Sequence, residues 1–351
     1  MRILYFTKYS RNAGSSRLRS YQYFPFLEKQ GILVEVSPLF SEAYLRKLYA
    51  GESTKSEALK GYLKRFLKLF SVRKYDKVVI EKELFPYLPA FAECLFHFLG
   101  VKYFVDYDDA VFHNYDLSSN KLIRKFLSKK IDWVMKFSGC VVAGNDYLAD
   151  RARDAGAKRI EIIPTVIDLE RYGVKNHGES SDSFVVGWIG TKTTFEKHLL
   201  PCRDWIKEIQ AENPDIDFHI VGITEDMDLG PNVKYRSWSE ETEVLEIQKM
   251  DVGIMPLQDS PWEKGKCAYK LIQYAACGIP GVASDVGMNR EVIVPGETGF
   301  LASTDVDWKN SILELKNRLE LRKDLGRNAR KLVEEKYCIQ VTAEKWIGLL
   351  R

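Results

Sequence analysis

Two lysines flank the expected start of a short helix in the C-terminal half of the chain. Lys266 and Lys270 lie beside a helix that we expect from Tyr269 to Cys277, with Gly278 as its C-terminal cap. The first turn of a helix leaves backbone N–H groups free, and the helix dipole adds partial positive charge there. Basic side chains at such a place favour a phosphate or diphosphate. The segment therefore predicts an anion site.

A second basic group follows the strand expected from Phe184 to Gly190. Thr191 comes next in the turn, and Lys192 and Lys197 follow it. Fixed positive charges stabilise a bound phosphate and the negative charge that develops on a departing one. Taken singly, each lysine is more simply explained as a solvated surface charge. As a cluster near a helix start, these lysines favour phosphate binding.

Three aspartates end the strand expected near Tyr103–Val105. Asp106, Asp108 and Asp109 precede His113, and carboxylates at a strand end can orient the hydroxyl groups of an acceptor. An Asp-x-Asp metal site for Mg²⁺ or Mn²⁺ and a helix cap are the alternatives. The phosphate-type segment lies in the other half of the chain, which disfavours the metal site. We therefore expect no metal and no other cofactor.

The first strand is followed by a turn that contains Gly14 and Arg17, both of which could approach a phosphate or sugar. No Gly-x-Gly-x-x-Gly fingerprint follows any expected strand, and this disfavours a nicotinamide or flavin enzyme. The six cysteines show no Cys-x-x-Cys spacing, which disfavours a zinc finger or redox motif.

Short apolar runs alternate with amphipathic stretches along the whole chain, and this alternation predicts parallel sheets covered by helices. In the first half we expect strands at 3–7, 33–37, 77–80, 103–105, 140–143 and 160–163, with helices at 18–30, 88–99, 121–137 and 146–155. In the second half we expect strands near 184–190, 217–221, 233–235, 252–255 and 281–283, with helices near 200–213, 241–248, 269–277 and 308–335. The 351 residues suffice for two domains, 1–165 and 183–336, joined by a polar linker at 166–182. A final helix at 337–351 is expected to cross back to the first domain.

Three segments of the second half resemble the donor-binding core of the retaining, two-domain glycosyltransferases of family four, also called group one. They are Asp251–Leu257, Lys264–Ser284 and Gly287–Leu301; in the first half, Gly14, Val105–Phe112 and Ile162–Asp168 resemble further family segments. The resemblance implies two Rossmann-like, doubly wound parallel-sheet domains facing a cleft, the GT-B fold. It also implies that the C-terminal domain binds a nucleoside-diphosphate sugar and that the N-terminal domain binds the acceptor.

The chain departs from the family pattern at two places. Two glutamates eight positions apart usually flank the donor site, and Gly265 and Gln273 occupy these positions here. Gln273 can still accept and donate hydrogen bonds to a ribose. Threonine replaces the usual arginine after the first strand of the second domain, so Lys192 is expected to substitute for it, and Lys197 matches the family lysine.

The resemblance and the residue chemistry together assign three sets of roles. The expected catalytic residues are Asp108, Lys197 and Lys270. The expected donor-binding residues are Gly14, Arg17, Gly190, Thr191, Lys192, Lys266, Cys267, Ala268, Tyr269 and Gln273. The expected acceptor-binding residues are Asp106, Asp109 and His113.

Charge is divided unevenly between the halves. Residues 1–182 hold 30 Lys and Arg against 22 Asp and Glu, whereas residues 183–351 hold 22 against 27. Much of the basic excess lies in Lys60–Lys77, a basic amphipathic helix that either packs its apolar stripe on its own domain or rests on an anionic membrane. No nucleic-acid-binding motif accompanies this charge, so we expect no nucleic-acid partner. Without a leader or membrane span, we expect a cytoplasmic protein, peripheral on the cytoplasmic face of the membrane.

The sequence thus predicts a retaining glycosyltransferase that moves a sugar from a nucleoside-diphosphate sugar to a glycan or lipid-linked acceptor in cell-surface polysaccharide or glycolipid synthesis. One rival is a sugar-nucleotide epimerase on the same fold. The other is a non-catalytic family member that binds a glycan or a partner enzyme, because Gly265 and Gln273 replace the usual acids.

Overall fold

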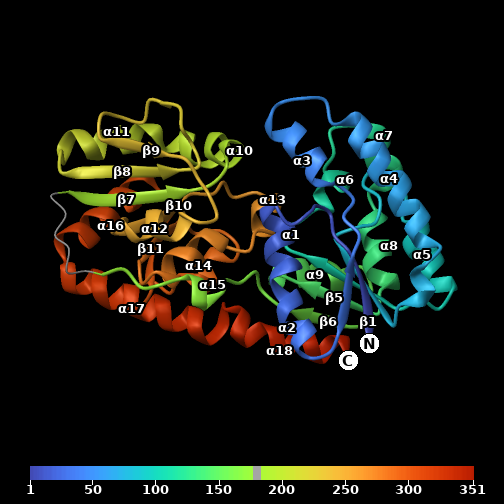
Figure 1. The fold of residues 1–351 in the computed structure, drawn as a ribbon. Helices are drawn as coiled ribbons and strands as arrows, with labels where there is room; N and C mark the ends of the chain where they lie inside the picture. Colours follow the sequence, from blue (N-terminus) through green and yellow to red (C-terminus); the bar gives the residue numbers. More distant parts are fainter. Residues whose placement is uncertain (177–182) are drawn as a thin grey trace. The chain divides into compact units, whose positions relative to one another are not determined.

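The computed structural model describes residues 1–176 and 183–351, and these residues form two compact units. The first unit comprises Met1–Thr165, Gly265–Cys267 and Thr342–Arg351, and the second comprises Val166–Lys264 and Ala268–Val341. Each unit contains one six-stranded parallel sheet with helices on its faces (Figure 1). The predicted pair of doubly wound parallel sheets is confirmed. Part of the expected linker, 177–182, lies outside the described residues.

The sheet of the first unit has the strand order β2-β1-β3-β4-β5-β6. Its strands are β1 (Arg2–Phe6), β2 (Leu33–Val36), β3 (Lys77–Glu81), β4 (Tyr103–Tyr107), β5 (Cys140–Ala143) and β6 (Ile160–Ile162). Every pairing is parallel, and the register sets Glu81 of β3 beside Asp106 of β4. The residues after these two strands therefore meet at one edge of the sheet.

The helices of the first unit are shorter than the sequence periodicity predicts. They are α1 (Gly14–Arg19), α2 (Phe24–Lys29), α3 (Glu42–Tyr49), α4 (Lys55–Leu69), α5 (Phe91–Phe98), α6 (His113–Asp116), α7 (Lys121–Leu127), α8 (Lys130–Phe137) and α9 (Asp146–Asp154). The single helix expected at 18–30 is wrong, because α1 ends at Arg19 and α2 starts anew with Pro25 in its first turn, where a missing N–H costs nothing. The single helix expected at 121–137 is also interrupted, at Ser128 and Lys129.

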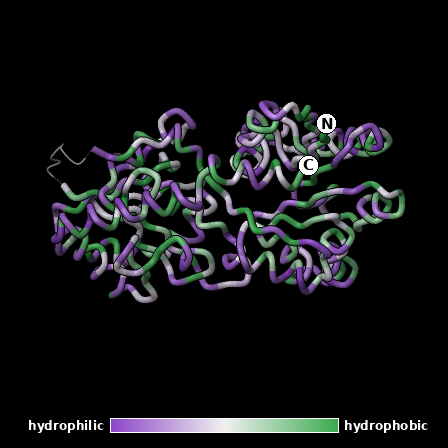
Figure 2. The backbone as a smooth tube through the Cα atoms, turned by 90° about the horizontal axis from the view of Figure 1, so that it is seen from below, coloured by the Kyte–Doolittle hydropathy of each residue, from purple (hydrophilic) through white to green (hydrophobic). Residues whose placement is uncertain are grey.

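Two layers of side chains cover the first sheet. Alternate strand residues such as Leu4, Phe6 and Ile80 join a buried cluster with residues of α5, α8 and α9. On the opposite face, Tyr5 packs edge-to-face against Phe24 of α2. Hydrophobic and hydrophilic stretches alternate along the tube in Figure 2, as expected for buried strands and amphipathic helices.

The sheet of the second unit has the strand order β12-β11-β10-β7-β8-β9. Its strands are β7 (Phe184–Ile189), β8 (Ile216–Val221), β9 (Val233–Arg236), β10 (Val252–Met255), β11 (Gly281–Ser284) and β12 (Gly299–Ala302). The sequence periodicity did not predict β12, which has only four residues. It pairs in parallel with β11, where Gly281 lies beside Gly299.

The helices of the second unit include the one that carries the predicted anion site. They are α10 (Lys192–Thr194), α11 (Arg203–Glu212), α12 (Glu243–Gln248), α13 (Pro261–Lys264), α14 (Tyr269–Ala276), α15 (Asn289–Val292), α16 (Asp305–Asn317) and α17 (Leu319–Lys336). The expected helix at 308–335 is divided at Arg318 into α16 and α17.

The last helix, α18 (Ile339–Leu350), begins in the second unit and continues into the first. Within the first unit, Thr342 Oγ1 lies 2.9 Å from the hydroxyl of Tyr23, and the Trp346 ring packs 5.8 Å from the Tyr23 ring. In the described parts of the chain, no helix has the length and apolar character required to cross a bilayer.

Candidate functional site

A buried lysine occupies the centre of the acidic strand ends in the first unit. The Nζ atom of Lys82 lies 2.8 Å from Asp108 Oδ1 and 3.6 Å from Asp109 Oδ2. It also donates a hydrogen bond of 3.0 Å to Ser15 Oγ, and Ser15 donates one of 2.9 Å to Asp108 Oδ2. The Lys82 side chain is only 5% exposed, so these contacts replace its hydration.

Lys82 reaches this place through an unusual turn after β3. Its φ angle is +66°, in the left-handed region that non-glycine residues seldom occupy, and its backbone N–H donates to the Asp106 carbonyl at 2.9 Å. Lys82 is not among the site residues predicted from the sequence. A basic residue directly after a buried parallel strand was the available signal, because ligands of such sheets bind beyond the strands' carboxyl ends.

The lysine sets the charge state of its neighbours. Burial opposes ionisation of Asp108, but Lys82 and Arg19 outweigh burial and lower the pKa of Asp108 to about 2. Burial, together with the Asp108 charge, raises the pKa of Asp109 above its usual value. The pKa of Lys82 is raised: burial lowers it, but the three neighbouring carboxylates more than compensate. Asp108 is therefore an anion at neutral pH and a weak base.

The segment Gly265–Cys267 belongs to the first unit and lies beside the same aspartates. Lys266 Nζ is 3.9 Å from Asp109 Oδ1, and Cys267 Sγ contacts the Asp108 carbonyl at 3.2 Å. Asn145 fixes the segment by donating to the Lys266 carbonyl at 3.0 Å. Asp108, Asp109, Lys266 and Cys267, all predicted site residues, are thus brought together with Lys82.

Gly265 has a steric reason for lacking a side chain. A Cβ atom at this position would lie 2.5 Å from the Cβ atom of Ala110 and 2.7 Å from its backbone nitrogen. Such contacts require displacement of the backbone. A glutamate, which the family pattern expects here, does not fit the observed conformation.

Other predicted residues of the first unit have structural partners. Arg19 of α1 pairs with Asp106, both side chains being at most 3% exposed, and this pair ties α1 to β4. His113 Nδ1 lies 2.8 Å from Asp116 Oδ1, and His113 Nε2 lies 2.8 Å from the Tyr147 hydroxyl. The acceptor-binding roles of Asp106 and His113 stay predictions.

The start of α1 leaves room beside the buried lysine. A Cβ atom at Gly14 would meet no heavy atom of the described residues within 4 Å. Arg17, on the same helix, is buried at 6% exposure. The donor-binding roles of both residues stay predictions.

In the second unit, Lys270 connects the start of α14 with the end of β7. Its Nζ atom lies 4.8 Å from the centroid of the Trp188 ring, a cation–π contact with a fully buried indole. The residue before α14, Ala268, has φ +48° and turns the chain into the helix. Lys270 and the turn after β7 are therefore close to each other.

Gly190 and Thr191 form that turn, and the backbone of Gly222 packs closely against it. A Cβ atom on Gly222 would lie 1.9 Å from the Gly190 carbonyl oxygen, and the φ angle of Gly222 is +100°. Thr194 Oγ1 accepts from the Thr191 backbone N–H at 3.1 Å and so caps the short helix α10. The turn is thus held by backbone contacts and leaves the Thr191 side chain exposed.

The other two predicted lysines form ion pairs. Lys192 pairs with Glu225 at 2.7 Å on the surface. Lys197 pairs with Glu263, whose carboxylate is fully buried and also accepts from Ser260. Burial opposes ionisation of Glu263, but Lys197 and Ser260 lower its pKa. Glu263 is a further residue that the sequence analysis did not identify.

Gln273 belongs to a buried polar network. Its Nε2 atom donates to the Tyr172 hydroxyl at 2.9 Å, and that hydroxyl donates to Glu243 Oε1 at 2.9 Å. Trp238 Nε1 donates to the other oxygen of Glu243 at 3.0 Å. This network, together with the neighbouring Tyr269, fixes the position of Gln273 at 3% exposure.

Within residues 1–176 and 183–351, no three His, Cys, Asp or Glu side chains are arranged to hold a metal ion. The expectation of metal-independent chemistry stays a prediction.

Comparison with known proteins finds a family match for the C-terminal part of the chain. Residues 183–317 match the family model described as "Glycosyl transferases group 1". Over these residues the chain is similar to the group 1 glycosyl transferases. The family that the sequence analysis recognised is thus confirmed, although this match spans the C-terminal segment alone and not most of the chain.

A curated relative extends the group 1 comparison to polysaccharide synthesis. The chain is 24% identical over 187 residues to the capsular polysaccharide biosynthesis glycosyltransferase CapM of Staphylococcus aureus. This alignment spans 51% of the chain and 49% of CapM. The chain therefore spans about half the length of this relative.

Solved structures of glycosyltransferases share the two-sheet fold. Sucrose-phosphate synthase of Thermosynechococcus elongatus superposes with a TM-score of 0.72 at 15% identity, covering 99% of this chain and 98% of that one. HepE of Anabaena, in a complex with UDP and glucose, superposes with a TM-score of 0.68 at 14% identity, covering 100% and 99%. At these identities the likeness establishes the GT-B fold.

Proposed function

We propose that this chain is a retaining glycosyltransferase that moves a sugar from a nucleoside-diphosphate sugar to a glycan or lipid-linked acceptor in the synthesis of cell-surface polysaccharide or glycolipid. The group 1 match over 183–317 supports sugar transfer, and the likeness to CapM supports a polysaccharide product. HepE was solved with UDP and glucose, which supports a uridine nucleotide as the donor to test first.

One observation carries the proposal: Lys270 lies over Trp188, at the start of α14 and beside the end of β7, inside the segment that matches the family. A diphosphate at this place would meet the ammonium group of Lys270 and the positive end of the α14 dipole. Both stabilise the negative charge on the leaving nucleoside diphosphate. Gly190, Thr191 and the buried Gln273 would contact the donor from the adjoining turn and from α14.

The acidic group of the first unit supports acceptor binding. Because the pKa of Asp108 is about 2, its carboxylate is ionised at neutral pH and can accept a hydrogen bond from an acceptor hydroxyl. A carboxylate with so low a pKa is a poor general base. Asp108 would therefore orient the hydroxyl, and the leaving phosphate itself would receive the proton, as a retaining transfer from the same face of the sugar requires.

Release of nucleoside diphosphate from a panel of UDP- and GDP-sugars by the purified protein tests the proposal. The proposal expects release from at least one donor and loss of that release in Lys270→Ala. A protein that binds glycan without releasing nucleotide would be the non-catalytic family member. Conversion of one sugar nucleotide into another without net release would identify the epimerase.

A further inference from the structure

Helix α4 presents its large apolar side chains to solvent. Leu59 is 73% exposed and Phe70 is 77% exposed, whereas the side of α4 that faces its own unit carries the buried Gly61 and Arg65. A Cβ atom at Gly61 would lie 2.0 Å from the Leu39 carbonyl oxygen, so α4 packs closely on that side. The interpretation in which the apolar stripe of this helix packs on its own domain is therefore wrong.

Two residues counted with the basic face of this helix are not available at the surface. The guanidinium group of Arg65 is 1% exposed and donates to the carbonyls of Leu84 at 3.1 Å and Ser37 at 2.7 Å. Burial lowers the pKa of Arg65 to about 9. Lys68 pairs with Glu35. The basic side chains that α4 exposes are Lys55, Lys60 and Lys64.

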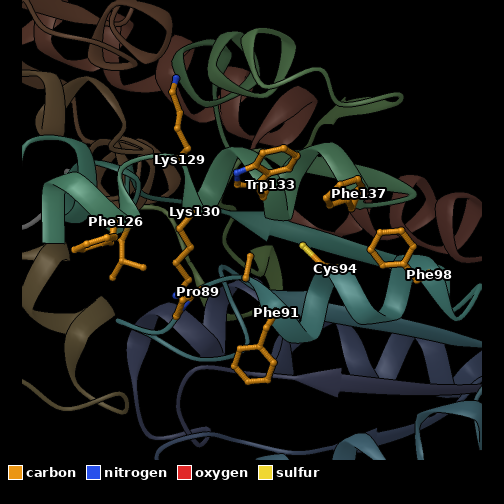
Figure 3. Close-up of a pocket in the computed structure, with 11 residues that line it drawn as sticks. Pro89, Phe91, Cys94, Phe98, Phe126, Lys129, Lys130, Trp133 and Phe137 are labelled. Carbon is orange, nitrogen blue, oxygen red and sulfur yellow. The ribbon is translucent and has the colours of Figure 1, made fainter. Parts of the chain in front are cut away.

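An aromatic hollow adjoins this helix on the same face of the sheet. Tyr62 of α4 contacts Phe85, and Phe85 stacks on Phe91 of α5. Between α5, α7 and α8 lies a hollow of about 460 Å³. Figure 3 shows its lining, which includes Phe91, Cys94, Phe98, Phe126, Trp133 and Phe137.

The lining of the hollow is unusually exposed. Phe98 is 79% exposed, Phe126 71% and Trp133 46%. Apolar rings exposed in such numbers on one face mark an interaction surface.

The exposed charged side chains of these helices have one sign. The exposed basic residues of α4, α7, α8 and the α7–α8 turn are Lys55, Lys60, Lys64, Lys121, Arg124, Lys125, Lys129 and Lys136. The carboxylates of α4, α5, α7 and α8 are Glu57, Glu93 and Asp132, and none of the three is exposed. The face is therefore both apolar and cationic.

We propose that this face, formed by α4, α5, α7 and α8, docks on a bilayer that contains anionic lipid. The lysines and Arg124 would contact the phosphate head groups, while the exposed Leu and Phe side chains of α4 and the rings around the hollow would enter the acyl boundary. Figure 1 shows α4, α5 and α8 near one another on the first unit, and α5 and α8 contact each other.

The charge pattern favours a bilayer over other occupants. A second copy of this chain would bring two cationic faces together, and like charges would oppose that contact. A nucleic acid would satisfy the lysines but would leave the exposed leucines and phenylalanines in water. An anionic bilayer satisfies both sets at once. The proposal is independent of the sugar chemistry, which concerns other residues.

Flotation of the full chain with vesicles tests the docking face. We expect recovery with vesicles of phosphatidylcholine and phosphatidylglycerol at low salt, little recovery with phosphatidylcholine alone, and a steep loss with added salt because the Debye length shortens. Lys64→Gln, Lys121→Gln and Lys125→Gln combined should lower the partition coefficient about 10²-fold. Phe66→Ala with Phe70→Ala should lower it by a similar factor, about 10²-fold, because apolar area is lost.

Matched variants in the second unit serve as controls. Lys323→Gln, Arg327→Gln and Lys331→Gln remove three charges from α17, and Leu245→Ala with Leu319→Ala truncates two exposed leucines. Both control sets should bind vesicles as the parent chain does. Trp133 adds a direct readout: lipids brominated on the acyl chain should quench its fluorescence, and Trp133→Phe should remove that quenching.

Three results would overturn the proposal. They are equal recovery with neutral and anionic vesicles, equal loss in the control variants and the face variants, and concentration-dependent self-association that Phe66→Ala with Phe70→Ala abolishes. Since nucleotide release is measured without lipid, failure of docking and failure of the proposed sugar transfer are distinguishable.

Discussion

Lys82 Nζ lies 2.8 Å from Asp108 Oδ1 at the end of neighbouring parallel strands, with the Lys82 side chain 5% exposed and the Asp108 side chain 12% exposed. The lysine holds the carboxylate as an anion at neutral pH, and Ser15 fixes its second oxygen. This pair gives the first unit a preorganised acceptor of hydrogen bonds, which is what a hydroxyl substrate needs.

The first prediction concerns turnover. Asp108→Asn should lower kcat by about 10²-fold or more, because the amide cannot orient the acceptor hydroxyl as the anion does. Nucleotide affinity should be unchanged, since the proposed diphosphate contacts are those of Lys270 and the start of α14 in the second unit. Steady-state kinetics with titration calorimetry measures both. Asp150→Asn, an exposed carboxylate on α9, is the control.

The second prediction concerns stability and pH. The pKa of Asp108 is about 2 in the folded chain, below its ordinary value of 3.8, so its ionisation stabilises the fold above pH 3.8 and that stabilisation is lost as the pH falls towards 2. The effect is on the order of 2 kcal/mol. The difference in unfolding free energy between the parent chain and Asp108→Asn should therefore shrink from pH 5 to pH 2. A difference that stays constant over this range would contradict the assignment.

The third prediction concerns the donor. Lys270→Ala should weaken UDP or GDP binding by about 1–3 kcal/mol, the range for loss of a charge-assisted hydrogen bond. Lys207→Ala on α11, an exposed lysine of the same unit, should leave affinity as it is. Calorimetric titration of both variants provides the comparison. If the Lys270 variant binds as the parent chain does, the anion site at the start of α14 is misplaced.

A fourth prediction follows from the packing around Gly265. Gly265→Glu restores the glutamate of the family pattern, yet it should destabilise the chain by about 1–3 kcal/mol because its Cβ atom collides with Ala110. Denaturant unfolding of Gly265→Ala and Gly265→Glu would reveal this cost. A glutamate variant that is as stable as the parent chain and more active would show that the glycine merely weakens an ordinary site.

The fifth prediction is that turnover persists in EDTA. Lysines and helix N–H groups supply the positive charge in the proposed site, so chelation of divalent ions should leave the rate within about twofold. Complete loss that Mn²⁺ restores would favour the Asp106 and Asp108 metal site instead.

The two parallel sheets could be predicted because their strands are apolar runs separated by long amphipathic stretches. The spacing of apolar residues within each short segment is enough to distinguish the two. The same periodicity failed at Ser20, Ser128 and Arg318, where helices end although the apolar spacing continues. It also failed to predict β12, whose four residues are placed by pairing with β11.

Fewer features of the candidate site than of the fold could be predicted from the sequence. Asp108, Lys266 and Lys270 stand out by residue type beside a strand end or a helix start. Lys82 also directly follows a strand, but its role and that of Glu263 depend on partners far away in the chain, Asp108 and Lys197. Spacing along one segment does not contain such contacts.

The most direct measurement is the NMR spectrum of the product formed from an α-linked nucleoside-diphosphate sugar and a glycan or lipid-linked acceptor. The proposed function predicts a new glycosidic signal with the small anomeric coupling of an α-linkage, formed as nucleoside diphosphate is released and absent with Lys270→Ala. A β-linked product would contradict retention. Intact donor across the whole panel of UDP- and GDP-sugars would contradict sugar transfer itself.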